Sequence, residues 1–210
     1  MIKMSGTPGS NPPNLCTISP DTRVALEHGA SLTSPWQCVE QLVSNSLEAG
    51  ATSIAVRADL ASNKLWLQVV DNGRGLSKEE LEVVGKLHWS GFERKGRSLA
   101  ALRRIAKEIS ITSTIQKQSG RYKTFSVRFV EGTRGAVVED SSLKKNSSTK
   151  VTVNGFLWNR GSRRLAVGEA AELSKLKRIL MAFALARPGI RYSHIRLVAY
   201  VSLCVQDESK

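Results

Sequence analysis

The sequence predicts an α+β fold, a two-layer sandwich in which helices pack on one face of a mixed β-sheet. Segments with apolar residues at every third or fourth position alternate with short β-branched or alternating segments, and these two patterns are typical of helices and strands. Their order is helix, hairpin, helix, loop, helix, several strands, helix and strand, without an internal repeat. A chain of 210 residues with 41% hydrophobic content supports one main core.

A first helix is predicted over 35–49, after a flexible Gly/Pro-containing leader over 1–20. Ser34 is a suitable N-cap, Pro35 suits the first helical position, and Gln37 completes a capping box. The core-facing side holds Val39, Leu42, Val43 and Leu47, and the opposite side holds Gln41, Asn45 and Glu48.

A hairpin follows, with strands over 53–60 and 64–70 that are separated by the polar turn 61–63. The run 77–80, Ser-Lys-Glu-Glu, is a second capping box and opens a short helix that Gly85 ends.

Further helix and strand signals follow along the chain. A glycine-containing basic loop over 86–96 precedes an amphipathic helix, and a long helix over 169–186 is ended by Pro188 and Gly189. The first of these helices buries Leu99, Leu102, Ile105 and Ala106; the second buries Leu173, Leu176, Leu180 and Phe183 and exposes Lys175, Lys177 and Arg178. Strands are expected over 109–115, 122–130, 150–153 and 190–205, with a surface loop over 140–148.

The run Asp71-Asn72-Gly73-Arg74-Gly75 is the clearest functional signal. It follows directly after an alternating apolar strand, so a carboxylate and two glycines stand at the strand's end. Such a pocket suits an acid that reads a base edge and a bare backbone that approaches a ligand. Neither a complete Walker loop nor a dinucleotide fingerprint is present, because the chain lacks the full Gly-x-x-x-x-Gly-Lys-Ser/Thr and Gly-x-Gly-x-x-Gly patterns.

The charge balance favours an anionic partner. The chain has 31 Lys and Arg against 18 Asp and Glu, a net charge of +13 and a pI near 10.1. The alternative is a basic surface that is only solvated. Cys16, Cys38 and Cys204 lack zinc spacing and indicate a reduced intracellular protein, and the apolar run 197–205 is too short for a bilayer. We therefore expect no membrane association.

The helix segment 39–51 together with 71–75 resembles the ATP site of the gyrase, heat-shock chaperone, histidine kinase and MutL superfamily. Within it, Asn-Ser-Leu-Glu-Ala-Gly-Ala over 45–51 is similar to the MutL branch of DNA mismatch repair proteins. The flanking residues 37–40 look most like the eukaryotic MutL gamma subunit. The resemblance covers roughly residues 20–195 and implies a Bergerat-type ATP-binding fold.

The resemblance implies ATP and Mg²⁺ as cofactors. In the family the position of Asn45 coordinates Mg²⁺, which prefers hard oxygen ligands, and Asp71 accepts from the adenine amine while Gly73 and Gly75 lie against the nucleotide. The family's phosphate-binding lid corresponds to Lys95-Gly96-Arg97-Ser98-Leu99, after a shortened loop. Gly96 is equally explained as a hinge at a helix start. Thr149 matches a threonine that supports the adenine pocket.

One position departs from the family pattern. Hydrolysing members have a carboxylate one turn before the magnesium-binding asparagine, where it activates the attacking water, and here that position is Gln41. An amide cannot take the proton. Glu40 is a poor substitute because one helical step of about 100° turns it away from Asn45. We expect nucleotide binding with feeble hydrolysis, so whether the chain is an enzyme stays open.

Three groups of basic residues predict non-specific contact with double-stranded DNA. Their members are Arg103, Arg104 and Lys107, then Arg163 and Arg164, then Lys175 and Arg178. The resemblance adds a second MutL-homolog subunit as heterodimer partner, a nuclear location, and a role in DNA damage repair and meiotic recombination.

The predicted organisation is a leader over 1–20, an ATP-binding domain over 21–195, and over 196–210 the start of a truncated second domain or a tail. Two alternatives stay open: a non-catalytic DNA-binding or partner-docking module with a vestigial pocket, and a chaperone or kinase of the same superfamily. The MutL-like run over 154–164 argues against the latter.

Overall fold

The computed structural model describes residues 32–60, 65–85, 95–117, 119–140, 146–158 and 168–194. The predicted leader, the loop over 86–94, Arg163 and Arg164, and everything after 194 lie outside the described residues.

Eight strands form one mixed sheet in the described part of the chain. The spatial order is β5-β4-β3-β7-β2-β1-β8, and β6 pairs with β4 beside β5. The strands are β1 (Ser53–Asp59), β2 (Trp66–Asp71), β3 (Ala106–Gln116), β4 (Tyr122–Val130), β5 (Thr133–Arg134), β6 (Val138–Asp140), β7 (Ser148–Phe156) and β8 (Arg191–His194). All neighbours are antiparallel except β8, which runs parallel to β1.

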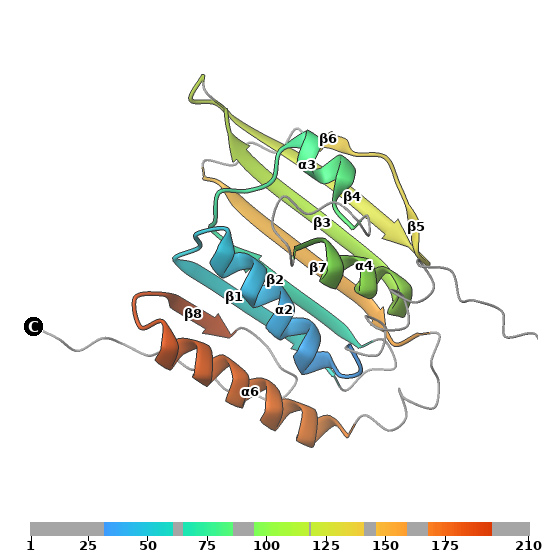
Figure 1. The fold of residues 1–210 in the computed structure, drawn as a ribbon, viewed down its shortest axis with the longest axis vertical. Helices are drawn as coiled ribbons and strands as arrows, with labels where there is room; N and C mark the ends of the chain where they lie inside the picture. The colour runs from blue at the N-terminus through green and yellow to red at the C-terminus, as the bar shows by residue number, and fades with distance from the viewer. Residues whose placement is uncertain are drawn as a thin grey trace, which may run out of the picture.

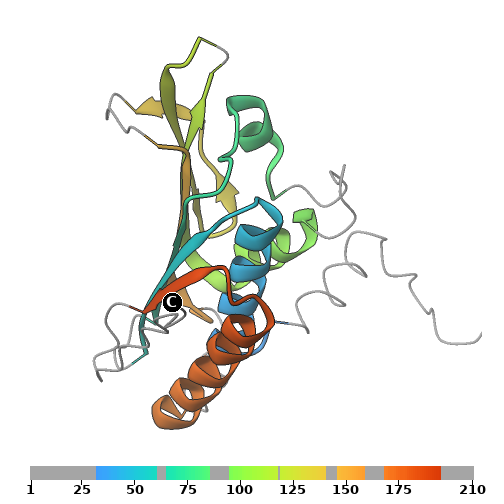
Figure 2. The same cartoon turned by 90° about the vertical axis from the view of Figure 1, so that its left-hand side faces the viewer.

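The described helices all cover the same face of this sheet, as the edge-on view in Figure 2 shows. They are α2 (Pro35–Glu48), α3 (Lys78–Val83), α4 (Lys95–Ile105) and α6 (Glu169–Ala186). In Figure 1, α2 crosses the middle of the layer, α3 and α4 lie over the β3–β4 half, and α6 runs along the outer edge beside α2. The predicted fold class, a mixed sheet with helices on one face, is confirmed.

Alternation along the strands places the core between the two layers. In β1, Ile54, Val56 and Ala58 are buried while the residues between them are partly exposed. This period of two sends every second side chain to the helix-covered face. Val39 and Leu42 of α2 fill the space above them and are almost completely buried.

Several boundaries differ from the prediction, and two of them have a clear physical reason. Ala106 is buried as expected, but it begins β3 and does not continue α4. The strand predicted over 150–153 runs over Ser148–Phe156, because it also includes polar residues such as Ser148 and Asn154, which face the uncovered side of the sheet. Alternation that includes polar residues on an open face is a weaker sequence signal than an apolar run.

Candidate functional site

Asp71 ends β2 with its side chain between the sheet and α2, and only 7% of its surface is exposed. One carboxylate oxygen, Oδ1, accepts a hydrogen bond from the Gly73 backbone at 2.9 Å. The other, Oδ2, accepts from the Ser46 hydroxyl of α2 at 2.8 Å. Each carboxylate oxygen has a second lone pair, so the group can accept a further donor.

Burial raises the pKa of Asp71 above its usual value of 3.8. The hydrogen bonds from the Gly73 backbone, the Ser46 hydroxyl and the Thr149 backbone act in the opposite direction, since they stabilise the ionised form. The acid is therefore held in a partly desolvated site by donors that favour its charge. A buried acceptor of this kind is typical of a site that binds a ligand.

The polar side of α2 carries the predicted metal ligand and the predicted base position. Asn45 directly precedes Ser46, is partly buried and lies near the end of α2. Gln41 lies one turn earlier and is exposed, and Glu40 is partly buried. Gln37 has a structural role, because its side-chain oxygen accepts from the backbone of Thr33 and Ser34.

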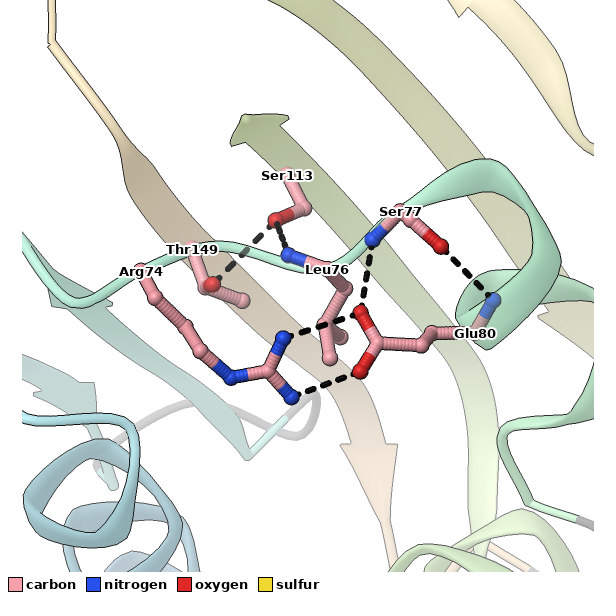
Figure 3. A network of polar contacts seen from close by, with 6 residues as sticks. All are labelled: Arg74, Leu76, Ser77, Glu80, Ser113 and Thr149. Atoms are coloured by element: carbon pink, nitrogen blue, oxygen red, sulfur yellow. Dashed lines mark hydrogen bonds and ion pairs between the residues drawn. The ribbon is translucent and has the colours of Figure 1, made fainter. Parts of the chain in front are cut away.

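The segment from Asp71 to Ser77 crosses from the sheet to α3 and is tied down along its length (Figure 3). The Arg74 backbone donates to Ala49 at the end of α2 at 3.0 Å, and the Leu76 backbone donates to the Ser113 hydroxyl at 2.7 Å. Gly75 has φ +78°, and a Cβ there would lie 2.2 Å from the Thr114 carbonyl oxygen. Only glycine fits this position without displacing β3.

Figure 3 also shows how the start of α3 is capped and linked to Arg74. The Arg74 guanidinium donates to both carboxylate oxygens of Glu80, at 2.6 and 3.1 Å. The same carboxylate accepts from the Ser77 backbone, and the Ser77 hydroxyl accepts from the Glu80 backbone. The second predicted capping box is thus present, and Glu80 has the additional role of holding the glycine-containing segment to α3.

Thr149 lies beside this segment on β7, is buried, and is paired in register with Asp71. Its hydroxyl is 3.2 Å from that of Ser113. Asp71, Ser46, Ser113 and Thr149 therefore form one polar cluster under the C-terminal part of α2. Sequence reasoning missed Ser46 and Ser113. The position of Ser46 beside Asn45 and one turn after Leu42 was an available signal.

α4 begins at Lys95, so Gly96, Arg97 and Ser98 lie in its first turn and not in a preceding loop. The structure describes their backbone as helical but not their side chains. Leu99 is 8% exposed and belongs to the core, so its side chain is not available to a ligand. The loop that leads into this turn, 86–94, lies outside the described residues.

A cavity of about 400 Å³ lies near the same strand ends but opens on the other face of the sheet. Its lining includes Ser53, Ala55, Val70 and Ser148, which alternate with the buried side chains that face the helices. Asp71 and Asn72 also line it, so the cavity reaches the end of β2 that carries the candidate acid. Ser46 and Thr149 do not line it, and the hydroxyl of Ser46 contacts Asp71 from the side that α2 covers.

The predicted DNA-contacting residues fall into different environments. Arg104, Lys107 and Arg178 are exposed, and Lys175 is half-exposed and bonded to Glu172 at 3.0 Å. Arg103 differs, because its guanidinium donates to the carbonyls of Gly85 and Gly132 and lies 5.0 Å from the centre of the Phe129 ring. Arg103 therefore holds the fold together and is not a free surface charge.

Two further kinds of site are absent from the described residues. No group of three or more His, Cys, Asp and Glu among these residues could hold a metal ion. No helix in the described part of the chain has the length and apolar character needed to cross a membrane.

Residues 32–133 match the family model described as "Histidine kinase-, DNA gyrase B-, and HSP90-like ATPase". The human DNA mismatch repair protein Mlh3 is 28% identical over 191 residues, which cover 84% of this chain and 13% of that protein. The DNA mismatch repair protein MutL of Shewanella loihica is 25% identical over 189 residues, which cover 84% of this chain and 29% of that protein. The chain thus spans less than a third of the length of these relatives.

Solved structures show the same fold at lower identity. The Aquifex aeolicus MutL ATPase domain complexed with ADP has a TM-score of 0.63 at 22% identity, with 78% of this chain and 60% of that chain covered. The topoisomerase IV ATP-binding domain of Francisella tularensis in complex with a small-molecule inhibitor has a TM-score of 0.58 at 19% identity, with coverages of 81% and 85%. The solved structures thus support the fold, and the sequence similarity to the mismatch repair proteins is modest.

Proposed function

We propose that this chain is the ATP-binding domain of a MutL-like DNA mismatch repair protein and uses the nucleotide as a conformational switch. The buried Asp71 carboxylate carries this proposal. It stands at a strand end under α2, keeps unused acceptor capacity, and follows the pattern of the ATPase fold that the comparisons support. An adenine exocyclic amine is a donor of the kind that this site accepts.

The described residues fit a metal that arrives with the nucleotide. Asn45 offers one amide oxygen on the polar side of α2, and no cluster of carboxylates for a protein-only site exists among the described residues. Mg²⁺ commonly takes one or two protein oxygens and completes its shell with phosphates and water. Bound there, it would neutralise phosphate charge, and Asn45 would hold it beside α2.

Hydrolysis is expected to be weak. Gln41 lies one turn before Asn45 on the same side of α2 and can orient a water molecule through its amide, but it cannot accept the proton. Glu40 points about 100° away around the helix. ATP would then persist in the site, and its binding and release would set the conformation.

The same proposal includes non-specific DNA binding, a second MutL-homolog subunit and a nuclear location. Arg104 and Lys107 are exposed near the junction of α4 and β3, close to the end of the predicted phosphate-binding helix. The net charge of +13 supports attraction to a polyanion. The mismatch repair relatives support the repair context.

Calorimetric titration of the chain with ATP and Mg²⁺ tests the proposal. We expect saturable binding by the wild type, and loss of binding in Asp71→Asn, because the new amide nitrogen would face the adenine amine donor to donor. Asp140→Asn is the matched control, since Asp140 is an exposed acid on β6. Absence of binding by the wild type, or equal binding by both variants, would overturn the proposal in favour of a non-catalytic docking module.

A further inference from the structure

The C-terminal end of α6 after Arg178 is apolar on every side. Its last eight residues, 179–186, read Ile-Leu-Met-Ala-Phe-Ala-Leu-Ala, whereas a surface helix normally presents polar residues to solvent. Leu180 is buried, and Phe183 packs against the core from a partly exposed position. Met181 and Leu185 face outward and are 49% and 80% exposed.

These exposed residues form a stripe with a defined geometry. Arg178, Met181 and Leu185 follow one another at helical spacings of three and four, so they lie on one side of α6. Ala182 beside them is also exposed and small, which permits close approach of another backbone. We call Arg178, Met181, Ala182 and Leu185 the α6 stripe.

The surroundings of the stripe carry charge of one sign. Between residues 173 and 194 the chain contains five Lys and Arg and no Asp or Glu. Lys175 is already bonded to Glu172, while Arg178, Arg187 and Arg191 are exposed around the end of α6 and the start of β8. Figure 1 shows α6 on the outer edge of the helix layer, where no other described element covers its far side.

We propose that the α6 stripe docks an acidic amphipathic helix of a partner protein. Such a helix places apolar side chains at spacings of three and four against Met181 and Leu185 and its carboxylates against Arg178 and Arg187. Methionine adapts to differently shaped apolar partners. The proposal does not depend on nucleotide binding.

Charge and shape argue against other occupants. DNA phosphates would interact favourably with Arg178 but not with the exposed apolar side chains of Met181 and Leu185. A symmetric second copy would bring the same basic residues face to face, since a two-fold interface uses one patch twice. An anionic membrane could bind both the basic and the apolar residues of the α6 stripe. Membrane insertion, however, favours a broad apolar face, and here Leu180 is buried in the core.

Fluorescence anisotropy with a labelled synthetic peptide tests the docking surface on the full chain. The peptide has about 18 residues, five helical turns, with leucines on one face and glutamates beside them; a second peptide has the same composition in scrambled order. We expect binding of the first peptide only, and a dissociation constant raised at least about tenfold by Leu185→Glu and by Arg178→Gln.

Val138→Glu is the matched control, because Val138 is an apolar residue 58% exposed on β6, which pairs with β4 and not with α6 or β8. It should leave peptide binding unchanged, and circular dichroism should show all variants folded. The proposal is wrong if the ordered and scrambled peptides bind alike or neither binds. It is equally wrong if Leu185→Glu changes only duplex DNA binding, binding to vesicles of equal parts phosphatidylserine and phosphatidylcholine, or self-association in sedimentation.

Discussion

The Ser46 hydroxyl has one proton and two acceptors within reach, the Leu42 carbonyl at 3.1 Å and Asp71 Oδ2 at 2.8 Å. Donation to Leu42 would leave the Ser46 oxygen free to accept, whereas donation to Asp71 stabilises its charge. The Ser46 hydroxyl can therefore keep a hydrogen bond to an amide at position 71, by donating to Leu42 and accepting from the amide nitrogen. The proposed ligand role of Asp71 can therefore be tested separately from its role in folding.

We expect Asp71→Asn to be as stable as the wild type or more stable at neutral pH without nucleotide. The folded pKa of Asp71 is raised above 3.8, so the folded protein holds this proton more tightly than the unfolded chain does. The free energy of unfolding contributed by Asp71 therefore falls as pH rises from about 3.8 through the folded pKa, and Asn lacks this loss. Thermal unfolding of both proteins across that range measures the difference. The prediction is that the stability of Asp71→Asn relative to the wild type rises between low pH and pH 7. A relative stability that falls over this range would contradict this reasoning.

Gln41 allows a second test at a single residue. Gln41→Glu restores a carboxylate one turn before Asn45, and a general base is typically worth about 10²- to 10⁴-fold in rate. We expect faster ATP turnover with little change in nucleotide affinity, measured by phosphate release and by calorimetry. Glu40→Gln should change neither quantity. Robust turnover by the wild type, unaltered in Gln41→Glu, would show that Gln41 does not limit the reaction.

Among the elements, α3 is held at both ends by arginines. Arg74 closes its start through Glu80, and two guanidiniums bind carbonyls at its other end: Arg103 binds Gly85, while Arg134 binds Leu81 and Val84. Both lie near the Phe129 ring, at 5.0 and 5.6 Å from its centre. Positive charge at a helix C-terminus is favourable, and the six-residue α3 cannot rely on its own length for stability.

We expect Arg103→Ala to lower the free energy of unfolding by about 2 kcal/mol, because it removes two charge-assisted hydrogen bonds and leaves the Gly85 and Gly132 carbonyls without this donor. Arg103→Lys should lose most of the same energy, since an ammonium cannot bind both carbonyls as a planar fork does. Urea unfolding measures both changes. Arg121→Ala, at an exposed turn residue, is the control and should shift the midpoint little. A midpoint for Arg103→Ala that matches this control would contradict the assigned role.

Helix starts were predictable where side chains reveal them. Pro35 and the capping boxes after Ser34 and Ser77 specify α2 and α3 locally. The end of α4 was not, because Ile105 and Ala106 are both buried and continue one apolar pattern across a change from helix to strand. The role of Arg103 could not be predicted from the sequence either, since only the folded sheet brings Gly132 and Phe129 close to it.

At the scale of the whole molecule, the excess of positive charge predicts how DNA binding responds to salt. If the net charge of +13 acts through phosphate contacts, the logarithm of the association constant should fall linearly with the logarithm of salt concentration, by about 0.9 for each phosphate contacted. Replacing Arg104 and Lys107 together by Gln should reduce this slope by about two. Anisotropy titrations with two unrelated duplexes measure it. Affinity that is independent of salt would rule out the electrostatic interpretation.

The candidate site was predictable only where, as in the fold, short local sequence patterns mark the residues. Asp71, Gly75 and Asn45 belong to short local patterns, and the structure brings Asp71 next to the helix that carries Asn45. Ser113 and Thr149 join the cluster from β3 and β7, and no local pattern marks that meeting. Which side chains from distant strands meet can be predicted only once the register of the sheet is known.

The position of β8 late in the chain has a consequence for folding during synthesis. It supplies the parallel neighbour of β1, with Ser53 opposite Arg191, so nearly the whole domain is translated before this edge is paired. Until residues 191–194 leave the ribosome, the nascent β1 presents unpaired backbone groups to other chains. Pulse-labelled nascent chains released before residue 191 should accordingly depend on chaperones more than those released after residue 194.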